Sequence, residues 1–359
     1  VTTTSSFDNF GNALVQETRT YVAENGVEKL TTKRLTNNSN IDNKGDALSQ
    51  TVASYRTTYA TVGGVEVATE TLVNFQVMTN RKFDTSHNIE NQNIYTYDDL
   101  NQTLLLDIQE IRSSGYTASG VASGQVIATY KPVTGKPAEL LDVKVVKNSG
   151  IDSKGNVDTS VTTKYRVSAT AAGEGIPDID FSSPIDEQVT VSKSFDIFGN
   201  AANQTVYKSW YDTTGTVPVL RFLEAQEVAN SSFDIYNQMH SSVVKTYSAA
   251  TCAIDNTSKK ATITITAASF KDRQEITITP NGYDKNGNVT YQTINTYVAK
   301  EGVVANPNDT LTLGLSDHKV TVNTYANAFA ARRGNATLSV TTRYYDDLAT
   351  QKIDRTETV

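Results

Sequence analysis

The sequence predicts an all-β fold built as a tandem array of β-hairpins, and three observations carry this prediction. A short motif, an apolar residue followed by Asp, two variable residues, Gly and Asn, recurs along all 359 residues. Each copy precedes a run rich in Thr, Val, Ile and Tyr, which favour strands. A Tyr stands thirteen residues after the Asp position in eight of nine copies. Repeats of roughly 40 residues are typical of arrays and solenoids, so we expect a β-strip, solenoid or tube-like array.

The motif is clearest at residues 7–12, 195–200 and 283–288. Counted from the Asp position, the copies begin near residues 8, 42, 84, 117, 152, 196, 234, 284 and 331, with spacings of 33 to 50 residues. The copies at 117 and 331 are degenerate and depend on the register of the other seven. We expect a single β-repeat domain over residues 1–359, either one segment of a longer chain or one subunit of a polymer.

The Asp-x-x-Gly step predicts a hairpin turn. The Asp carboxylate accepts the backbone N–H two residues later, and the Gly adopts the positive φ that closes such a turn. His87 and Asn237 replace the Gly in two copies and tolerate positive φ. A calcium site is the functional alternative, but the alternating oxygen ligands and closing Glu of an EF-hand loop are missing. The predicted structural turn residues are Asp8, Gly11, Asp42, Gly45, Asp84, Asp152, Gly155, Asp196, Gly199, Asp234, Asp284 and Gly287.

The strand after each turn carries a recurring pattern. Counted as residues after the Asp, the fifth position is apolar, the tenth is β-branched, and the eighth is Gln in six copies. A column of Gln predicts either an amide ladder along the sheet or a row of solvated polar side chains. The fifth and tenth positions have opposite parity, so either both faces of the strand are partly covered or a bulge separates them. The returning strands, such as residues 261–266, alternate apolar residues with Thr, which indicates one buried and one wet face.

The Tyr at the thirteenth position predicts packing at the end of the strand, with an apolar ring body and a hydroxyl at the wet edge. Sugar binding is the alternative function of such a Tyr. In the copy that begins at 196, Ser209 takes this place. The predicted packing residues are Tyr21, Tyr55, Tyr97, Tyr130, Tyr165, Tyr247, Tyr297 and Tyr344.

Charge and composition limit the partners. The formal net charge is −7, with both signs interspersed, which argues against nucleic acid and anionic membranes. No run of 18 apolar residues occurs, so we expect no membrane insertion. Cys252 is the single cysteine, which excludes an internal disulfide; it is expected to be a small buried hydrophobe or, alternatively, a link to another chain. The Thr-, Asn- and Ser-rich polar set favours an extracellular or cell-surface protein.

Catalytic motifs are missing from the sequence, so we expect no enzyme, no cofactor and no metal. His87, His240 and His318 are widely separated, and no HExxH, cysteine pair or phosphate-cradling Gly loop occurs. The neighbouring carboxylates at 98–99 and 346–347 would point to opposite faces of a strand and would not act as a pair. Two stretches with weak helical signals, residues 219–228 and 326–333, are expected as strand or loop.

The ends of the chain begin and stop as if within a strand, and residue 1 is Val. A further copy of the motif would continue the repeat in register after residue 359. We therefore expect partners to be other copies of the chain, joined end to end through uncapped edges. Glycans are the other expected partner, because eight Asn-x-Ser/Thr sequons occur, at Asn37, Asn101, Asn203, Asn230, Asn256, Asn288, Asn308 and Asn335.

The strings at residues 195–200, 211–215 and 283–288 resemble the YD repeats of the RHS family, whose Tyr-Asp-x-x-Gly hairpins spiral as a β-strip. The resemblance covers the turns of all nine units and little between them, and the family's period is about half of this one. It implies a strip of hairpins and a bacterial cell-surface setting. It implies neither toxin encapsulation nor any catalytic residue.

These observations together favour a structural extracellular protein that assembles head to tail into a filament, sheath or surface layer. The alternative is a cell-surface adhesin that binds glycan or host protein through exposed Tyr, Trp and Asn side chains.

Overall fold

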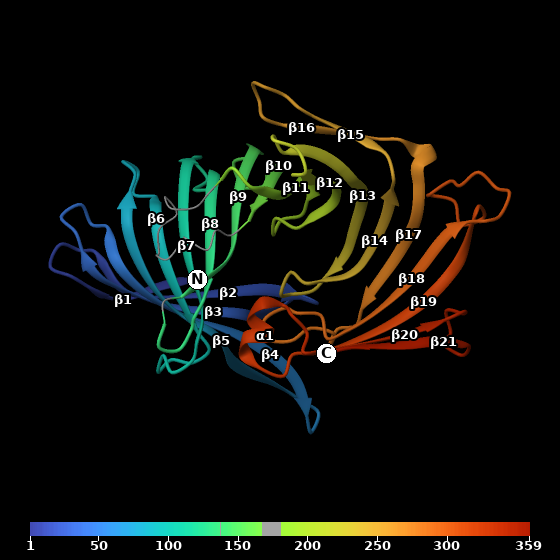
Figure 1. Cartoon of the computed structure of the whole chain (residues 1–359). Coiled ribbons are helices and arrows are strands. Elements are labelled where there is room, and N and C mark those ends of the chain that lie inside the picture. The colour runs from blue at the N-terminus through green and yellow to red at the C-terminus, as the bar shows by residue number, and fades with distance from the viewer. Residues whose placement is uncertain (137, 167–180) are drawn as a thin grey trace. The chain divides into compact units, whose positions relative to one another are not determined.

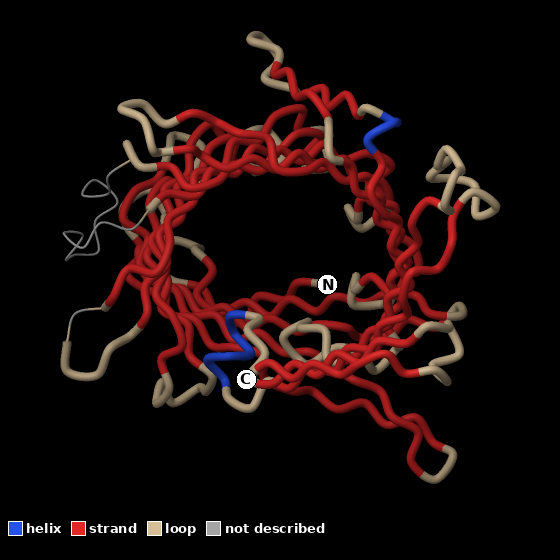
Figure 2. The backbone as a smooth tube through the Cα atoms, turned by 45° about the vertical axis from the view of Figure 1, so that its right-hand side comes forward, coloured by secondary structure: helices blue, strands red, loops and turns tan. Residues whose placement is uncertain are grey.

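The computed structural model describes residues 1–136, 138–166 and 181–359, and almost every ordered element is a strand (Figures 1 and 2). The strands are β1 (Thr2–Phe7), β2 (Ala13–Glu24), β3 (Val27–Ile41), β4 (Ala47–Val62), β5 (Val65–Phe83), β6 (Ile89–Tyr97), β7 (Leu105–Tyr116), β8 (Ala122–Lys131), β9 (Glu139–Ile151), β10 (Val157–Tyr165), β11 (Pro184–Phe195), β12 (Ala201–Asp212), β13 (Val219–Phe233), β14 (Met239–Tyr247), β15 (Ala250–Ile254), β16 (Ala261–Ile265), β17 (Phe270–Ile278), β18 (Tyr291–Ala299), β19 (Leu313–Thr324), β20 (Leu338–Tyr344) and β21 (Lys352–Thr358). The described helices are a 3₁₀ turn, η2 (Ala267–Ser269), and α1 (Ala328–Arg333).

The strands form an antiparallel meander. Nineteen belong to one sheet, and β15 and β16 form a separate two-stranded ribbon. Paired registers run from β1 to β7 and from β10 to β14, then continue from β14 through β17 to β21. Antiparallel neighbours in chain order are successive hairpins. The predicted all-β hairpin array is therefore confirmed.

Contacts along the chain define two compact units. In its described part, unit 1 comprises Val1–Tyr116 and most of Gln125–Lys144, and unit 2 comprises Thr117–Gly124, Val145–Arg166 and Phe181–Val359. The expectation of one repeat domain stays a prediction.

Each unit has its own small apolar cluster. In unit 1, Val52, Met78 and Ile94 are buried and Ile111 packs against them. Val52 and Ile94 occupy the β-branched tenth position of their repeats. The adjacent Val52 and Ala53 are only 1% and 3% exposed, so both faces of β4 are covered at this point. The opposite parity of the fifth and tenth positions reflects this double coverage.

In unit 2, the inserted β15–β16 ribbon packs on the sheet. Its Ala261 joins Val189 and Val191 in a buried cluster, with the half-buried Cys252 beside them. The backbone N–H of Ala261 donates to Thr159 Oγ1 on β10 over 3.1 Å. Burial raises the pKa of the Cys252 thiol, as desolvation of a thiolate requires.

A β-bulge recurs at one place in the repeat. The register shifts between the twelfth and thirteenth positions in all eight copies whose pairing the structure describes; examples are Thr20/Tyr21, Ser54/Tyr55 and Thr96/Tyr97. In each case the following strand carries one extra residue. The copy without the Tyr has the same shift, between Lys208 and Ser209. The bulge is thus a property of the hairpin geometry, and the Tyr marks its position without being required for it.

At the ninth predicted turn, near residue 331, the expectation of strand or loop for residues 326–333 was wrong, because α1 forms there. Asn327 caps the helix by accepting the Ala330 N–H at 2.9 Å. Gly334 ends it at a φ of 68°. A left-handed Gly serves both a helix C-cap and a hairpin turn, which explains why the sequence resembled a degenerate copy of the turn. The other weak helical stretch, residues 219–228, lies in β13 as expected.

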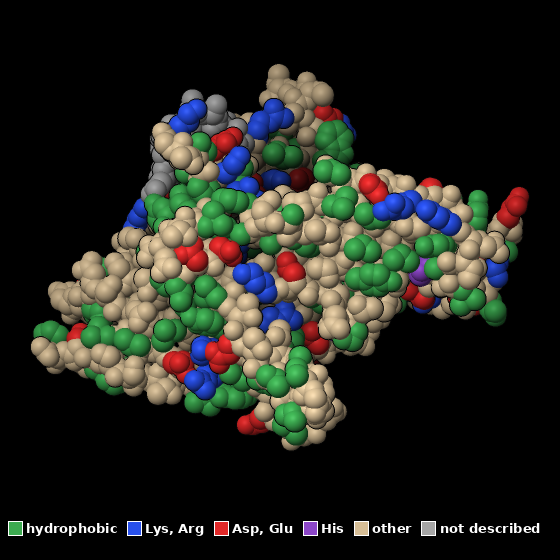
Figure 3. Space-filling model, turned by 90° about the horizontal axis from the view of Figure 1, so that it is seen from below, with side chains coloured by type: hydrophobic (Ala, Val, Ile, Leu, Met, Phe, Trp, Pro, Cys, Tyr) green, Lys and Arg blue, Asp and Glu red, His purple; other side chains and the backbone are tan. Residues whose placement is uncertain are grey.

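The visible surface carries mixed charge. In Figure 3, Lys and Arg side chains lie interspersed with Asp and Glu side chains among apolar and uncharged groups. Ion pairs join many of the charged side chains in the described part of the chain, such as Lys208 with Glu224 at 2.9 Å. Within the described ranges, no helix has the length and apolar character needed to cross a membrane.

Candidate functional site: the turn edge of the sheet

The predicted Asp turns connect odd-numbered strands to even-numbered ones through most of the chain, so in each unit they fall along one edge of the meander. We call this edge the turn edge. The turn at Asp196 shows its geometry. Oδ1 of Asp196 accepts the N–H groups of Phe198 and Asn200 at 2.8 and 2.9 Å, and Oδ2 accepts Asn200 Nδ2 at 2.9 Å. The Gly199 N–H donates to the Asp196 carbonyl at 3.2 Å.

The same five-residue arrangement occurs in the other turns that begin with Asp. Backbone bonds link the first residue to the fourth and fifth in the turns that begin at Asp8, Asp42, Asp84, Asp152, Asp234 and Asp284. The fourth residue of the turn, with the Asp counted as the first, has positive φ throughout. These residues are Gly11, Gly45, Gly155, Gly199 and Gly287 and the non-Gly residues His87 and Asn237.

These hydrogen bonds lower the pKa of several turn carboxylates. The side-chain amide of Asn12 is the main cause that lowers the pKa of Asp8, and Asn88 and Asn156 do the same for Asp84 and Asp152. In the turn at Asp42, the backbone N–H of the fifth residue is the main cause of the lowered pKa. Donors that point at a carboxylate favour its charged form.

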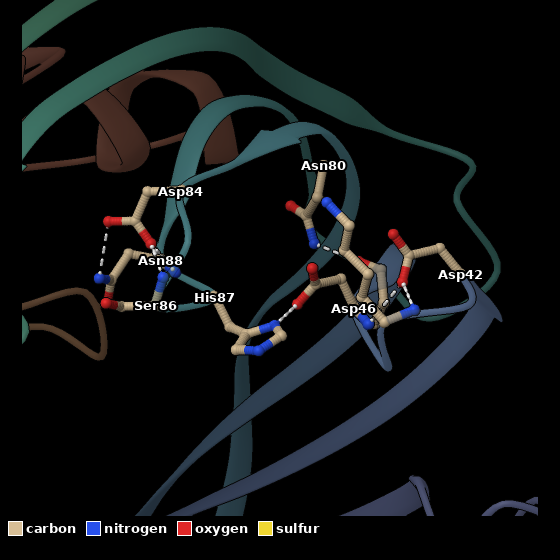
Figure 4. A network of polar contacts seen from close by, with 9 residues as sticks. Asp42, Asp46, Asn80, Asp84, Ser86, His87 and Asn88 are labelled. Carbon is tan, nitrogen blue, oxygen red and sulfur yellow. Dashed lines mark hydrogen bonds and ion pairs between the residues drawn. The ribbon is translucent and has the colours of Figure 1, made fainter.

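Neighbouring turns touch through a regular contact: the fifth residue of one turn lies against the fourth residue of the next. Figure 4 shows this between the second and third turns, where Asp46 Oδ1 and His87 Nδ1 are 2.7 Å apart. Asp46 is only 6% exposed. In unit 2, Asn200 Nδ2 donates to Asn237 Oδ1 at 3.2 Å. His87 thus serves a turn-to-turn contact.

Where the fourth residue is Gly, the contact is steric. A Cβ on Gly45 would lie 3.0 Å from Asn12 Oδ1, and a Cβ on Gly199 would lie 3.1 Å from Asn156 Oδ1. A side chain at these positions would be strained twice, by its positive φ and by the neighbouring turn. The fourth position therefore takes Gly for two reasons, of which the sequence shows only the first.

A second recurring contact joins successive hairpins. In four hairpins, an Asn four residues before the turn extends its side-chain amide to the preceding hairpin, where it donates to the backbone carbonyl of the residue that directly follows the five-residue turn. We call this contact the clasp. The four Asn clasps are Asn38 to Ala13 at 2.9 Å, Asn80 to Ala47 at 2.7 Å, Asn148 to Ala122 at 3.1 Å and Asn230 to Ala201 at 3.3 Å.

Other side chains reach the corresponding carbonyl where the Asn is missing or the register is shifted. The Tyr116 hydroxyl donates to the Ile89 carbonyl and the Tyr283 hydroxyl to the Met239 carbonyl. In the last hairpin, Asn323 Nδ2 donates to the Val289 carbonyl at 3.0 Å. The sequence signal for this contact was an Asn or Ser four residues before five of the seven turn Asp residues, with Thr4 and Pro280 as the exceptions, and the sequence analysis missed it.

The predicted Gln column forms an amide ladder over part of unit 1. Gln50 Nε2 donates to Asn38 Oδ1 at 2.8 Å, Asn80 Nδ2 donates to Gln50 Oε1 at 3.0 Å, and Gln92 Nε2 donates to Asn80 Oδ1 at 2.7 Å. Asn80 is 2% exposed. Of the two interpretations left open, the ladder applies here. It combines with the clasp, because Asn80 takes part in both.

The Tyr residues of the thirteenth position differ in burial. Tyr130 and Tyr247 are 1% and 4% exposed, whereas Tyr21 is 39% exposed. The others are half-buried; they are Tyr55, Tyr97, Tyr165, Tyr297 and Tyr344. Two of these aromatic rings pack edge-on against Phe, Tyr165 with Phe181 at 5.2 Å and Tyr247 with Phe270 at 6.0 Å between centroids.

The hydroxyls of two of these Tyr residues bond to acidic side chains. Tyr247 donates to Glu227 at 2.8 Å and Tyr297 to Glu275 at 3.4 Å. Burial, aided by the nearby carboxylate, raises the pKa of Tyr297. An apolar ring with a bonded hydroxyl is a packing arrangement.

The remaining His residues have local partners. His240 Nδ1 lies 2.7 Å from the Ile278 carbonyl, and His318 Nδ1 bonds to Asn295 Oδ1. In the part of the chain that the structure describes, no group of three or more His, Cys, Asp or Glu side chains is arranged to hold a metal ion.

The turn edge has a hollow beside Ser192 in unit 2, with a volume of about 590 Å³. Its walls include Phe195, Phe198 and Phe233, with Gln204 and Asn230. It lies between the turns at Asp152 and Asp196, where Ser replaces the clasp Asn. A smaller hollow of about 370 Å³ in unit 1 is lined by Ser113, at the same repeat position.

Comparison with known proteins adds no argument to the fold described above. No family model matches the chain, and no curated protein matches it. Among solved structures, the crystal structure of TcdB2-TccC3 without hypervariable C-terminal region aligns with 98% of this chain and 20% of that chain, at 11% identity and a TM-score of 0.18. The chain thus spans about a fifth of that protein, and so low a TM-score carries no argument. What stands is an all-β strip of hairpins.

Proposed function

We propose that this chain is a structural extracellular protein and that copies of it associate end to end through their outermost strands. The support is the repeated bonding between hairpins: ladder hydrogen bonds, turn-to-turn contacts and clasps all propagate in one direction along the sheet. Hairpins of this kind stabilise one another in series, as repeats in solenoids do.

The observation that carries the proposal is that backbone N–H and C=O groups of an outermost strand, β1, point away from its paired neighbour β2. β1 and β21 are the first and last strands of the paired series. Val1 and Arg19 exchange two backbone hydrogen bonds at 2.8 Å, so the next residue, Thr2, directs its N–H and C=O away from β2. Thr4 has the same parity. Outward-facing backbone groups of this kind accept another strand.

The test uses a double variant, Thr2→Pro with Thr4→Pro. Proline removes the outward N–H groups without breaking the bonds to β2, because those belong to Val1 and Thr3. The matched control is Thr2→Val with Thr4→Val, which keeps the N–H groups and favours strand. We expect concentration-dependent sedimentation and fibres in negative-stain microscopy for the parent and the control, and a monomer for the proline variant.

A parent chain that sediments as a monomer at every concentration would overturn the proposal. So would a proline variant that associates as well as the control. A cell-surface adhesin is the second candidate function, favoured by the aromatic and amide lining of the hollow beside Ser192.

A further inference from the structure

The hollow beside Ser192 exists because a clasp is missing. Pairing of β10 with β11 places Thr159 opposite Val191, the same register that places Val15 opposite Asn37 and Ser49 opposite Thr79. The residue that follows in the returning strand is Asn38 or Asn80 in those two hairpins, and each bonds a carbonyl of the previous hairpin.

Here that residue is Ser192, whose side chain has two fewer non-hydrogen atoms than Asn and ends at Oγ. It accepts Gln204 Nε2 at 3.2 Å within its own hairpin. Val157, which occupies the repeat position of Ala13 and Ala47, is part of the wall, so we expect its carbonyl to be the one that an Asn at position 192 would reach. The two hollows at Ser113 and Ser192 thus follow from one substitution in the repeat.

The walls of this hollow combine aromatic faces with amides. Phe198 stands at the turn tip and is 50% exposed, and Phe195 and Phe233 are half-buried below it. Aromatic faces carry partial negative charge and attract the C–H groups of a saturated ring.

The polar groups can both donate and accept. Gln204 uses one amide hydrogen on Ser192, and an amide has a second hydrogen and a carbonyl oxygen for a ligand. The two hydrogens of Asn200 go to Asp196 and Asn237, so its carbonyl oxygen remains as an acceptor.

These features select one chemical class. A purely apolar ligand would bury the amides without partners, at a cost of about 1–3 kcal/mol for each unpaired group. An anion such as phosphate would meet the amide carbonyl oxygens, with Lys154 as the one cationic side chain of the wall. A ring that carries hydroxyls on its rim and C–H groups on its faces satisfies both kinds of wall. The volume lies within the range of about 300–1,000 Å³ that small-ligand sites occupy.

We propose that this hollow is a saccharide-binding site that holds a pyranose ring of a neutral oligosaccharide against Phe198, with Gln204 and Asn200 bonded to its hydroxyls. The site rests on the second candidate function, and its readout is independent of end-to-end association. Failure of saccharide binding therefore leaves the structural proposal untouched.

The decisive variant is Ser192→Asn. It should rebuild the clasp to the Val157 carbonyl and fill the hollow, so the protein keeps or gains thermal stability while binding falls at least tenfold. Phe198→Ala should weaken binding by about tenfold, because a half-exposed ring is not needed for folding but supplies one face of the site. The matched control is Ser113→Asn, which adds the same amide at the equivalent position in unit 1 and should leave binding unchanged.

Binding is measured on an array of defined neutral oligosaccharides and then in solution by ligand-observed NMR with cellobiose, lactose and maltose. Inorganic phosphate and a neutral hexapeptide serve as competitors. The inference is overturned if no saccharide binds, if phosphate or the peptide binds in its place, or if Ser192→Asn binds the saccharide as well as the parent does.

Discussion

Asn80 offers the sharpest test of how the hairpins are joined. Its buried side chain donates to the Ala47 carbonyl and to Gln50, and accepts from Gln92. Replacing it by Ala removes three hydrogen bonds, and a net loss of about 1 kcal/mol for each gives about 3 kcal/mol in total. With a urea m-value of about 3 kcal/mol/M, the midpoint should fall by about 1 M.

Two further variants separate the hydrogen bonds from packing. Asn80→Asp has nearly the same shape but cannot donate at neutral pH, so it should be at least as unstable as Asn80→Ala at pH 7 and recover in part in acid, where the carboxyl group regains a proton. Asn101→Ala, on an exposed loop, should change stability by less than about 0.5 kcal/mol.

Equilibrium unfolding in urea, followed by far-ultraviolet circular dichroism, gives these differences. The reasoning is refuted if Asn80→Ala costs less than about 1 kcal/mol, or if Asn80→Asp is as stable as the parent at neutral pH, because a buried donor would then contribute nothing.

Three other predictions follow from the turn edge and the bulges. Gly45→Ala should lower stability by about 1–2 kcal/mol for its φ of 89°, and further for the contact with Asn12, whereas Gly11→Ala carries the φ cost alone because its surroundings are open; thermal melts of the two variants should differ in that order. The pKa of Asp152 is lowered below 3.8 in the folded state by Asn156, so its stabilisation is present above about pH 4 and is lost as the pH falls through the folded pKa; Asp152→Ala should therefore melt lower than the parent at pH 7 and converge with it in strong acid. Burial raises the pKa of Asp272, so stability falls as the pH rises from 3.8 through the folded pKa, and Asp272→Asn should raise the melting temperature at pH 7 with little effect at pH 3; an unchanged or lower melting temperature at pH 7 would contradict this reasoning.

The hairpin array could be predicted because its chemistry is local. The Asp carboxylate, the N–H groups that it accepts and the residue with positive φ all lie within five positions. A repeated local signal of this kind does not depend on which strands meet. The period near 40 residues then implied the order of pairing, since antiparallel neighbours need only short connections.

The contacts between hairpins could not be predicted in the same way, because their partners are far apart in sequence. Asn80 reaches Ala47 across 33 positions, and nothing near Asn80 indicates that carbonyl. The turn-to-turn contact of His87 with Asp46 spans 41 positions. His87 fits its turn as a residue with positive φ, and this local role gives no sign of its contact with Asp46.

The helix α1 was missed for a different reason. Its six residues are too few to show a helical period, and helices of this length depend on their caps. The cap at Asn327 and the left-handed Gly334 use the same residue types that hairpin turns use. The two structures differ only in the residues between, where Ala and Arg favour helix.

The recurring bulge has a consequence for how such a chain changes length. From the Asp to the bulge, each repeat whose pairing the structure describes keeps thirteen positions, so neighbouring repeats share the same register over this portion. Beyond the bulge the two arms of a ribbon can extend together, as β4 and β5 do up to the paired residues Val62 and Val65, which flank Gly63 and Gly64. That tip lies beyond the residues whose register recurs from repeat to repeat. Foreign peptides grafted between the two glycines should therefore be displayed on a stalk, while the neighbouring hairpins keep their alignment.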